Sequence, residues 1–372
     1  MRVDGGYFLY EKVSMQLMQE IAQGVYKEGS CLPSERDIAE RFGVDRTTVR
    51  KALDQLVDEG VVEKRAGSCS KVLRRSQSND RPRIHIGSMI GFFVVEDRKV
   101  NRTITQPFYS DLFYEVEQQC KRHGINVMYA TIKNTDEYLN LLSQISGVII
   151  AGRASPEYFA LAEQQDICAL HINGYNGISP SVFYDGLSAA RLMTKYLIDN
   201  GHRDLALITG SRDFFTSQNR LAGVLLTLFQ HGIPIRPEWV LEGTWEYESG
   251  YRLAMGLLQA PGRRPTAIYA FNDTMALGAM QAIRELGMGI PGDISVAGGD
   301  NMRELKTSEE MLTTTNANVT RMAIAAVNHF LHTPEDTAGL QVTVPVDLIK
   351  GDTVMDIRHG QRQGANHFLE NI

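Results

Sequence analysis

The feature that most constrains the fold begins at Ile84, where short uninterrupted apolar runs start to alternate with segments of helical periodicity. The predicted strands are IGFFVV (90–95), INVMYA (125–130), GVIIAG (147–152), CALHIN (168–173), LALITG (205–210), AIYAFN (267–272) and SVAGGD (295–300). Segments such as SAARLMTKYLIDNG and TMALGAMQAIRELG, typical of helices, lie between them. Apolar strands alternating with helices predict an α/β fold with a parallel sheet covered on both faces. About 270 residues exceed one ordinary sheet, so we expect two doubly wound lobes with a cleft between them.

Polar and aromatic residues gather where these strands end and the next helices begin. Ligands of doubly wound sheets bind at that edge, and sugars suit aromatic faces combined with carboxylate, amide and guanidinium groups. The predicted effector-binding residues are Phe108, Tyr109, Asn173, Thr216, Arg220, Trp245, Asn272 and Asp300. Taken singly, each has a structural alternative, because Asn and Asp cap helices and Trp245 could belong to the core. Their common location favours a binding site.

The first 75 residues have a different pattern. Apolar residues Val13, Leu17, Ile21 and Val25 share a helical face that we expect to end near Gly29. Ser34 with Asp37 predicts a capping box for a second helix, which ends at Gly43. A third helix follows the tight turn, with Asp45 as its N-cap. The stretch VVEKRAGSCSKVLRR predicts a β-hairpin, so the whole is a winged helix-turn-helix.

The third helix crowds arginines and threonines into its first two turns. A recognition helix presents such residues to base edges and phosphates in the major groove, whereas a solvated amphipathic helix is the structural alternative. The turn, the capped preceding helix and the basic hairpin together favour DNA binding. The predicted DNA-binding residues of the helices are Arg36, Arg46, Thr47, Thr48 and Arg50, and Lys71 of the basic hairpin is added to them.

The charge distribution agrees with a local DNA-binding surface. Residues 1–75 hold 13 Lys+Arg against 12 Asp+Glu, whereas the remainder holds 25 against 32. Between Lys64 and Arg83 there are seven basic residues and one acid. We expect a DNA-binding domain over 1–73, a polar linker over 74–83, an effector-binding and dimerisation domain over 84–357 and a polar tail over 358–372. The alternative for 74–83 is a surface loop within one domain.

Motifs of catalysis are absent from the sequence. The stretch ITGSRDFF has a glycine after a strand but neither a G-x-G-x-x-G nor a G-x-x-x-x-G-K-[ST] loop, and no G-x-S-x-G or H-E-x-x-H pattern appears, so we expect neither an enzyme nor a cofactor. His171 lies in an apolar strand, where a hydrogen-bonded core histidine is the better interpretation than a metal ligand. The four cysteines are scattered without a C-x-x-C pair, which argues against disulfides and structural zinc. Neither a signal peptide nor a membrane span is visible, which predicts a cytoplasmic protein.

Two family resemblances follow from these motifs. The stretch LPSERDIAERFGVDRTTVRKALDQLVDEGVVEKRAGS resembles the DNA-binding domain of GntR-type bacterial regulators over about residues 7–73. That likeness implies that positions Arg36, Arg46, Thr48 and Arg50, with the wing tip near Gly67, touch operator DNA. The wing departs from the family pattern, with Cys69-Ser70-Lys71-Val72 in place of the usual Gly-Thr-Phe-Val.

The second resemblance covers about residues 84–352. DGLSAARLMTKYLIDNGHRDLALITG, NRLAGV and FNDTMALGAMQAIRELGMGIPGDISVAGGDN are similar to the effector-binding domain of LacI/GalR-type repressors, which has the periplasmic sugar-binding-protein fold. The likeness implies that Tyr109, Asn173, Thr216, Arg220, Trp245, Asn272 and Asp300 line the effector cleft. Asn173 stands where an aspartate is usual, Gly299 replaces a common aromatic residue, and the hinge-helix sequence is absent from 74–83. This pairing of domains resembles the arabinose-responsive AraR type of regulator.

These observations predict a ligand-responsive transcriptional regulator that acts as a repressor. Its predicted partners are double-stranded operator DNA, a small-molecule effector of the sugar class and a second copy of the chain, with no membrane. A cytoplasmic sugar-binding receptor or a carbohydrate enzyme without DNA function is the alternative. The winged helix weighs against the receptor, and the missing nucleophile and cofactor motifs weigh against the enzyme.

Overall fold

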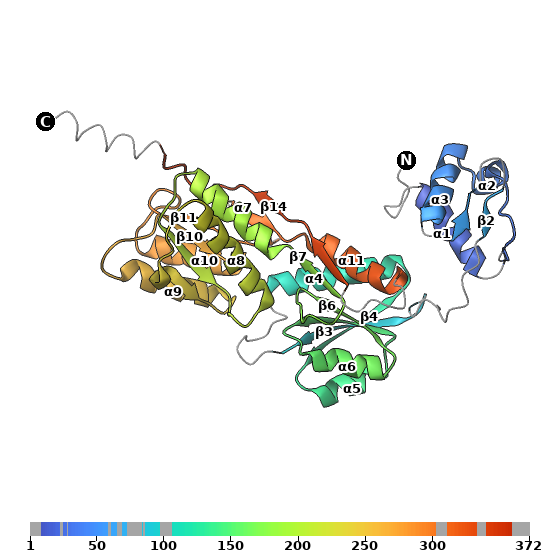
Figure 1. The fold of residues 1–372 in the computed structure, drawn as a ribbon, viewed down its shortest axis with the longest axis horizontal. Helices are drawn as coiled ribbons and strands as arrows, with labels where there is room; N and C mark the ends of the chain where they lie inside the picture. The colour runs from blue at the N-terminus through green and yellow to red at the C-terminus, as the bar shows by residue number, and fades with distance from the viewer. Residues whose placement is uncertain are drawn as a thin grey trace. The chain divides into compact units, whose positions relative to one another are not determined.

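The computed structural model describes residues 9–22, 25–27, 29–58, 61–64, 69–72, 84, 86–96, 106–302, 311–332 and 340–358. The chain divides into two compact units, Met1–Arg81 and Pro82–Ile372 (Figure 1). Each unit has its own hydrophobic core. The expected linker, 74–83, and all but Arg358 of the expected tail lie outside the described residues.

The N-terminal unit packs three helices and a small hairpin around one core. Its elements are α1 (Leu9–Ala22), α2 (Glu35–Phe42), α3 (Arg46–Asp58), β1 (Val62–Glu63) and β2 (Lys71–Val72). Leu17, Val49 and Leu56 are fully buried in this core. The antiparallel pairing of β1 with β2 supplies the wing, so the unit is a winged helix-turn-helix, as the sequence predicts.

The helix ends of this unit follow the predicted capping residues. The Ser34 side chain accepts from the Asp37 backbone N–H and the Asp37 carboxylate accepts from the Ser34 N–H, which completes the capping box. Gly43 ends α2 with φ of 62°, a conformation that glycine adopts without steric cost. Asp45 Oδ1 accepts from the Thr48 N–H at 2.8 Å. The predicted end of the first helix is wrong: α1 ends at Ala22, and Val25 is 62% exposed in a bend.

The expectation against disulfides is also wrong, because Cys31 and Cys69 are bonded to each other. The segment before α2 pairs with β2, as the Leu32 N–H donates to Ser70 O at 2.8 Å and the Val72 N–H donates to Ser30 O at 2.9 Å. This pairing brings two cysteines 38 residues apart in sequence to a Cα–Cα distance of 5.7 Å. A search for closely spaced cysteine pairs misses such a contact, since only the tertiary fold creates it.

The first sheet of the larger unit has six parallel strands in the order β13-β7-β6-β5-β3-β4. They are β3 (Met89–Val95), β4 (Asn126–Ile132), β5 (Gly147–Gly152), β6 (Cys168–Ile172), β7 (Ser181–Tyr184) and β13 (Gln341–Val344). Helices α4 (Pro107–Arg122) and α11 (Val319–His332) cover one face, and α5 (Thr135–Leu142) and α6 (Pro156–Gln164) cover the other (Figure 1). The central strands β3 and β5 are buried on both faces, which is why they are continuous apolar runs.

The second sheet has four parallel strands in the order β11-β10-β8-β9. They are β8 (Leu205–Thr209), β9 (Val240–Glu242), β10 (Ala267–Ala270) and β11 (Ser295–Ala297). Helices α7 (Gly186–Asp199) and α8 (Phe215–Gln230) pack together, as do α9 (Tyr247–Gln259) and α10 (Asp273–Glu285). A short antiparallel ribbon of β12 (Thr314–Asn316) and β14 (Asp347–Ile349) completes the chain path.

The seven predicted strands are all present, and the two-lobed α/β fold is confirmed. The sequence did not predict β7, β9, β12, β13 or β14. These strands are short, and three of them are half-exposed edge or ribbon strands without a continuous apolar run. Because the chain crosses between the sheets more than once, residues from both halves of the sequence meet at the carboxyl ends of the strands.

Candidate functional site

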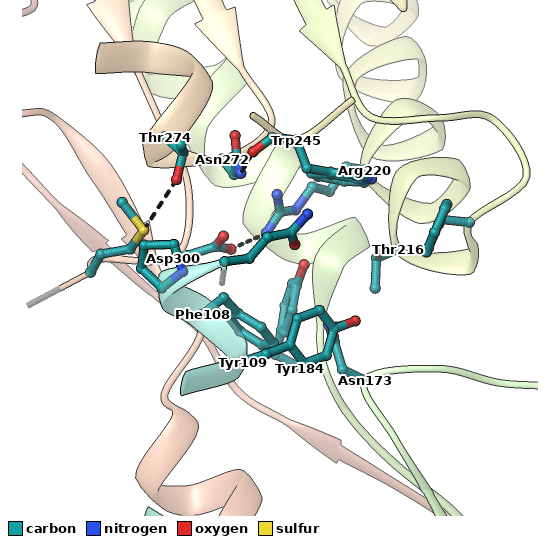
Figure 2. Close-up of a pocket in the computed structure, with 14 residues that line it drawn as sticks. Phe108, Tyr109, Asn173, Tyr184, Thr216, Arg220, Trp245, Asn272, Thr274 and Asp300 are labelled. Carbon is teal, nitrogen blue, oxygen red and sulfur yellow. Dashed lines mark hydrogen bonds and ion pairs between the residues drawn. The ribbon is translucent and has the colours of Figure 1, made fainter. Parts of the chain in front are cut away.

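A pocket that is partly open to solvent lies at the carboxyl ends of the strands of both sheets. All eight predicted effector-binding residues line it (Figure 2). Six further residues complete the lining: Gln106, Pro107, Tyr184, Phe214, Thr274 and Met302. The sequence missed Tyr184 because it ends β7, a strand too short to recognise. Thr274 could have been found because it lies two residues after the predicted site residue Asn272, which is the N-cap of α10.

A buried ion pair stands at the centre of the pocket. Nη2 of Arg220, on α8, donates to Oδ1 of Asp300, which follows β11 (Figure 2). The side chains are 1% and 9% exposed, so solvent screens their attraction little. Burial raises the pKa of Asp300, and the Arg220 charge opposes that shift. The pair therefore presents a dipole of nearly zero net charge to the pocket.

Several polar atoms of the lining are buried without a hydrogen-bond partner. They are Nε and Nη1 of Arg220, Oδ1 of Asn173 and Nε2 of Gln106. An unpaired buried donor or acceptor costs about 1–3 kcal/mol. Three unpaired donors and one unpaired acceptor around one cavity are what a polar ligand with several oxygens would satisfy.

Aromatic rings form the rest of the wall. Phe108 and Tyr109 contact edge to face with centroids 5.3 Å apart, and Tyr184 lies 6.1 Å from Phe108. The Arg220 guanidinium lies over the Tyr184 ring at 5.0 Å and 5.9 Å from the Trp245 ring. Burial raises the pKa of the Tyr109 hydroxyl to about 12, so this group stays protonated and can donate or accept.

Three of the predicted residues have backbone conformations that side chains rarely adopt. Asn173, Trp245 and Asp300 have φ of 55°, 69° and 105°. Such conformations cost about 1–3 kcal/mol each and concentrate at functional sites. Close packing holds one of them in place: a Cβ at Gly210 would lie 1.8 Å from Cζ2 of Trp245, so only glycine leaves room for the indole.

Asn272 differs from the other lining residues because its amide already has partners. Its Oδ1 accepts from the Met275 N–H at 3.0 Å, which caps α10, and its Nδ2 donates to Trp245 O at 2.9 Å. The structural alternative of a helix cap thus applies to Asn272. Its neighbour Asp273 is fully buried, and burial followed by the charge of Asp300 raises the pKa of Asp273 to about 8.

His171 has the role expected of a core histidine. It is 3% exposed, and Nε2 lies 3.1 Å from Gly152 O. Burial lowers its pKa to about 4, so the ring is neutral near pH 7.

Within the described ranges, no group of three His, Cys, Asp or Glu side chains is placed to hold a metal ion. None of the helices over those same residues is long and apolar enough to cross a membrane.

The exposed face of α3 carries the two predicted DNA-binding arginines of the recognition helix. The side chains of Arg46 and Arg50 are 65% and 59% exposed, and both pair with Glu35 of α2, at 3.9 and 3.0 Å. Lys64 of the wing reaches the same carboxylate at 3.5 Å. The sequence did not single out Glu35 or Lys64, because nothing in the spacing shows that α2, α3 and β1 converge.

The remaining predicted DNA-binding residues are less uniform. Arg36 is 81% exposed, and Thr47 and Lys71 are exposed as well. The Thr48 hydroxyl donates to Asp45 Oδ2 at 2.9 Å and so contributes to the helix cap. Gly67, predicted to lie at the wing tip, is outside the described residues.

Comparison with known proteins identifies both units. Residues 91–352 match the family of periplasmic binding proteins and the sugar-binding domain of the LacI family. The chain belongs to the LacI family. Residues 9–72 match the gntR family of bacterial regulatory proteins.

Relatives within the LacI family are transcriptional repressors. The chain is 31% identical over 303 residues to the HTH-type transcriptional repressor PurR of Pectobacterium carotovorum, which covers 75% of this chain and 84% of that protein. It is 28% identical over 308 residues to PurR of Histophilus somni, covering 79% and 90%. A structure of the lac repressor dimer bound to operator and the anti-inducer ONPF superposes with a TM-score of 0.63 at 26% identity, covering 72% of this chain and 94% of that one.

This LacI-family chain therefore carries a gntR-type DNA-binding domain on the N-terminal side of its ligand-binding domain. The protein is a ligand-responsive transcriptional regulator, as the sequence predicts. The likeness to the arabinose-responsive AraR type stays a prediction, and so do the roles of the individual site residues.

Proposed function

We propose that this LacI-family regulator is a cytoplasmic repressor without catalytic activity, which releases operator DNA when a neutral sugar occupies its pocket. The observation that carries the effector class is the buried Arg220–Asp300 pair together with the unpaired polar atoms around it. Because Asp300 already neutralises Arg220, a neutral polyhydroxylated ligand can satisfy these atoms without burying a further charge.

Each part of the pocket has a role in this proposal. Hydroxyl oxygens of the sugar would accept from Nε and Nη1 of Arg220 and from Nε2 of Gln106, and a hydroxyl would donate to Oδ1 of Asn173. The rings of Phe108, Tyr109 and Trp245 would pack on the C–H faces of the sugar, as apolar walls do in small-molecule sites. Thr216 and Asn272 would line the site, the latter mainly by holding α10.

On the DNA side, we propose that α3 enters the major groove. Arg46 would read guanine, and Thr47, Thr48 and Arg50 would contact phosphates or base edges. Arg36 and Lys71 would contact the backbone, and Gly67 would let the wing tip approach it. The exposure of the two α3 guanidinium groups supports this assignment, because they can exchange Glu35 for a phosphate or a base.

A ligand screen tests the effector class, with Trp fluorescence as the measure of unfolding. Both tryptophans, Trp239 and Trp245, belong to the core of the four-stranded sheet, so their emission follows unfolding of that lobe in the full chain. A ligand at 100 times its dissociation constant adds about 2.7 kcal/mol of stability. We expect this shift with a neutral monosaccharide. A shift with sugar phosphates or nucleobases and with no neutral sugar would refute the effector class.

Gel-shift titration tests the DNA assignment, with a duplex selected from a random pool by the wild-type protein. Arg46→Ala should lose about 1–3 kcal/mol for each base contact removed and should relax specificity. Lys71→Ala should weaken all sequences about equally and reduce the salt dependence. Lys195→Ala removes an exposed positive charge from α7 and serves as the control. Wild-type binding by Arg46→Ala would remove α3 from the interface.

The protein acts as a homodimer in this proposal, so that two winged helices read a palindromic operator. The lac repressor named above is a dimer on its operator, which supports the idea. Residues 84–372 expressed alone should remain dimeric, and residues 1–75 should be largely monomeric. Light scattering that shows a monomeric 84–372 fragment at tens of micromolar would contradict dimerisation through the larger unit.

A further inference from the structure

Two cysteines lie beside β2 of the wing: Cys69 is two residues before β2 in the segment that joins it to β1, and Cys31 is in the segment before α2 that pairs with β2. Cys31 and Cys69 are bonded, and both residues are exposed. The other two cysteines differ: Cys120 is buried and Cys168 is half-buried, and both are free. Exposed disulfides are accessible to reductants and belong to the labile, regulatory group more often than buried ones. In a protein that acts on chromosomal DNA, a disulfide is usually transient or redox-sensing.

The position of the bond links it to the DNA-binding surface. The bond closes a loop that contains all of α2 and α3, because these helices span 35–58 between the two cysteines. Lys71, predicted to contact DNA, lies directly opposite Cys31 in an antiparallel bridge. Directly opposed residues point to the same face, so the sulfur stands beside a positively charged side chain. The bond therefore ties the segment before α2 to the part of the wing that carries Lys71.

We propose that Cys31 and Cys69 form a reversible thiol–disulfide switch that sets operator affinity, with the oxidised form binding more tightly. Hydrogen bonds hold the segment before α2 to the wing as far as Leu32 and Ser70, and the disulfide adds a covalent bond one residue closer to the wing tip, at Cys69. A wing that is anchored before binding loses less conformational entropy when it meets DNA. The proposal rests on the assignment of the winged unit to operator DNA.

The chemistry needs only a low-molecular-weight disulfide such as oxidised glutathione. The thiolate of one cysteine attacks this disulfide, forms a mixed disulfide and releases one glutathione thiolate. The second cysteine thiolate attacks the protein sulfur of the mixed disulfide, forms the Cys31–Cys69 bond and releases the second glutathione thiolate. The two thiol protons pass to the two released thiolates, so two protein thiols are oxidised while one glutathione disulfide is reduced to two thiols.

The experiment measures thiols and DNA binding on the same full-length samples. The protein is equilibrated with reduced or with oxidised glutathione, and free thiols are counted after denaturation and located by peptide mapping. We expect four free thiols in the reduced protein and two, Cys120 and Cys168, in the oxidised protein. The DNA probe is the duplex selected from a random pool by the wild-type protein without added thiol or oxidant. The oxidised protein should bind it about three- to tenfold more tightly than the reduced protein.

Variants separate the switch from a general effect of oxidation. Cys31→Ser/Cys69→Ser should bind like reduced wild type in either glutathione state, whereas Cys168→Ala should keep the full redox response. Free thiols at Cys31 and Cys69 after oxidation, equal affinities in the two states, or tighter binding by the reduced form would each overturn the proposal. If neither redox form binds the duplex better than a scrambled one, the DNA assignment itself fails, and the thiol count reports separately on the bond.

Discussion

The buried Arg220–Asp300 pair allows a prediction that separates ligand binding from stability. Asp300→Asn removes the negative charge and keeps the size of the side chain. Because Arg220 is 1% exposed, its charge is left in the interior with a neutral partner. Removing one member of a buried pair costs about 3–5 kcal/mol, and we expect the lower value because asparagine can still accept a hydrogen bond. A loss of about 3 kcal/mol lowers Tm by about 6–12 °C.

The assay is thermal unfolding of the full chain followed by Trp fluorescence, which reports on the lobe that holds Arg220 and Asp300. Asp199→Asn is the matched control, since it makes the same substitution in an exposed ion pair with Lys195 and should change stability by less than about 1 kcal/mol. Arg220→Met combined with Asp300→Asn should cost less than the sum of the single variants, because the double variant leaves no unpaired charge. Additive losses, or equal Tm values for Asp300→Asn and Asp199→Asn, would refute the coupling.

Effector affinity should fall at least tenfold in Asp300→Asn while operator affinity stays unchanged.

Three further predictions concern single groups. Asp273 has a pKa raised to about 8, so between about pH 4 and pH 8 it stays protonated in the folded state while the unfolded chain has lost its proton. Its contribution to the free energy of unfolding is therefore full below about pH 4 and falls by about 1.4 kcal/mol per pH unit up to about pH 8. Asp273→Asn should remove this slope from unfolding measurements made across this pH range, and an unchanged slope would contradict the raised pKa. Gly210→Ala should displace the Trp245 indole, which changes the Trp emission and weakens effector binding. Gly256→Ala is the control, because nothing lies within 4 Å of an added Cβ there, and it should leave stability unchanged or increase it. A normal Trp spectrum in Gly210→Ala would count against the close packing of Trp245 on Gly210. Reduction of the Cys31–Cys69 bond should destabilise the winged unit by up to about 4 kcal/mol. Circular dichroism can follow the unfolding of this unit, while Trp emission stays constant because both tryptophans belong to the larger unit. Identical melting in the two redox states would disprove the stabilisation by the bond.

Local patterns explain why the sequence predicts much of this protein. The winged helix-turn-helix depends on short-range signals: the Ser34–Asp37 capping box, the left-handed glycine at Gly43 and the Asp45 cap each act within a few residues. The predicted end of the first helix was wrong because apolar spacing is also only a local signal. Val25 is in register with the buried face of α1 but is 62% exposed, and an exposed apolar residue does not extend a helix. The central strands β3 and β5 were predictable as continuous apolar runs, since burial on both faces requires apolar side chains.

The eight effector-site residues were predictable as a group because parallel strands bring their carboxyl ends to one edge, whatever the details of packing. Their individual roles were not. Asn272 has the same position relative to its strand as a binding residue would have, yet only the structure shows its amide engaged with Met275 and Trp245.

The sequence by itself thus determined the elements, their class and the edge where a ligand binds, because hydrophobic periodicity, capping and turn chemistry are local properties of the chain. The tertiary structure decided the pairings between distant residues: Arg220 with Asp300, Glu35 with Arg46 and Arg50, and Cys31 with Cys69. These contacts join residues 11 to 80 positions apart. Their partners depend on how helices and strands pack around a shared core, and no local pattern in the sequence contains that information.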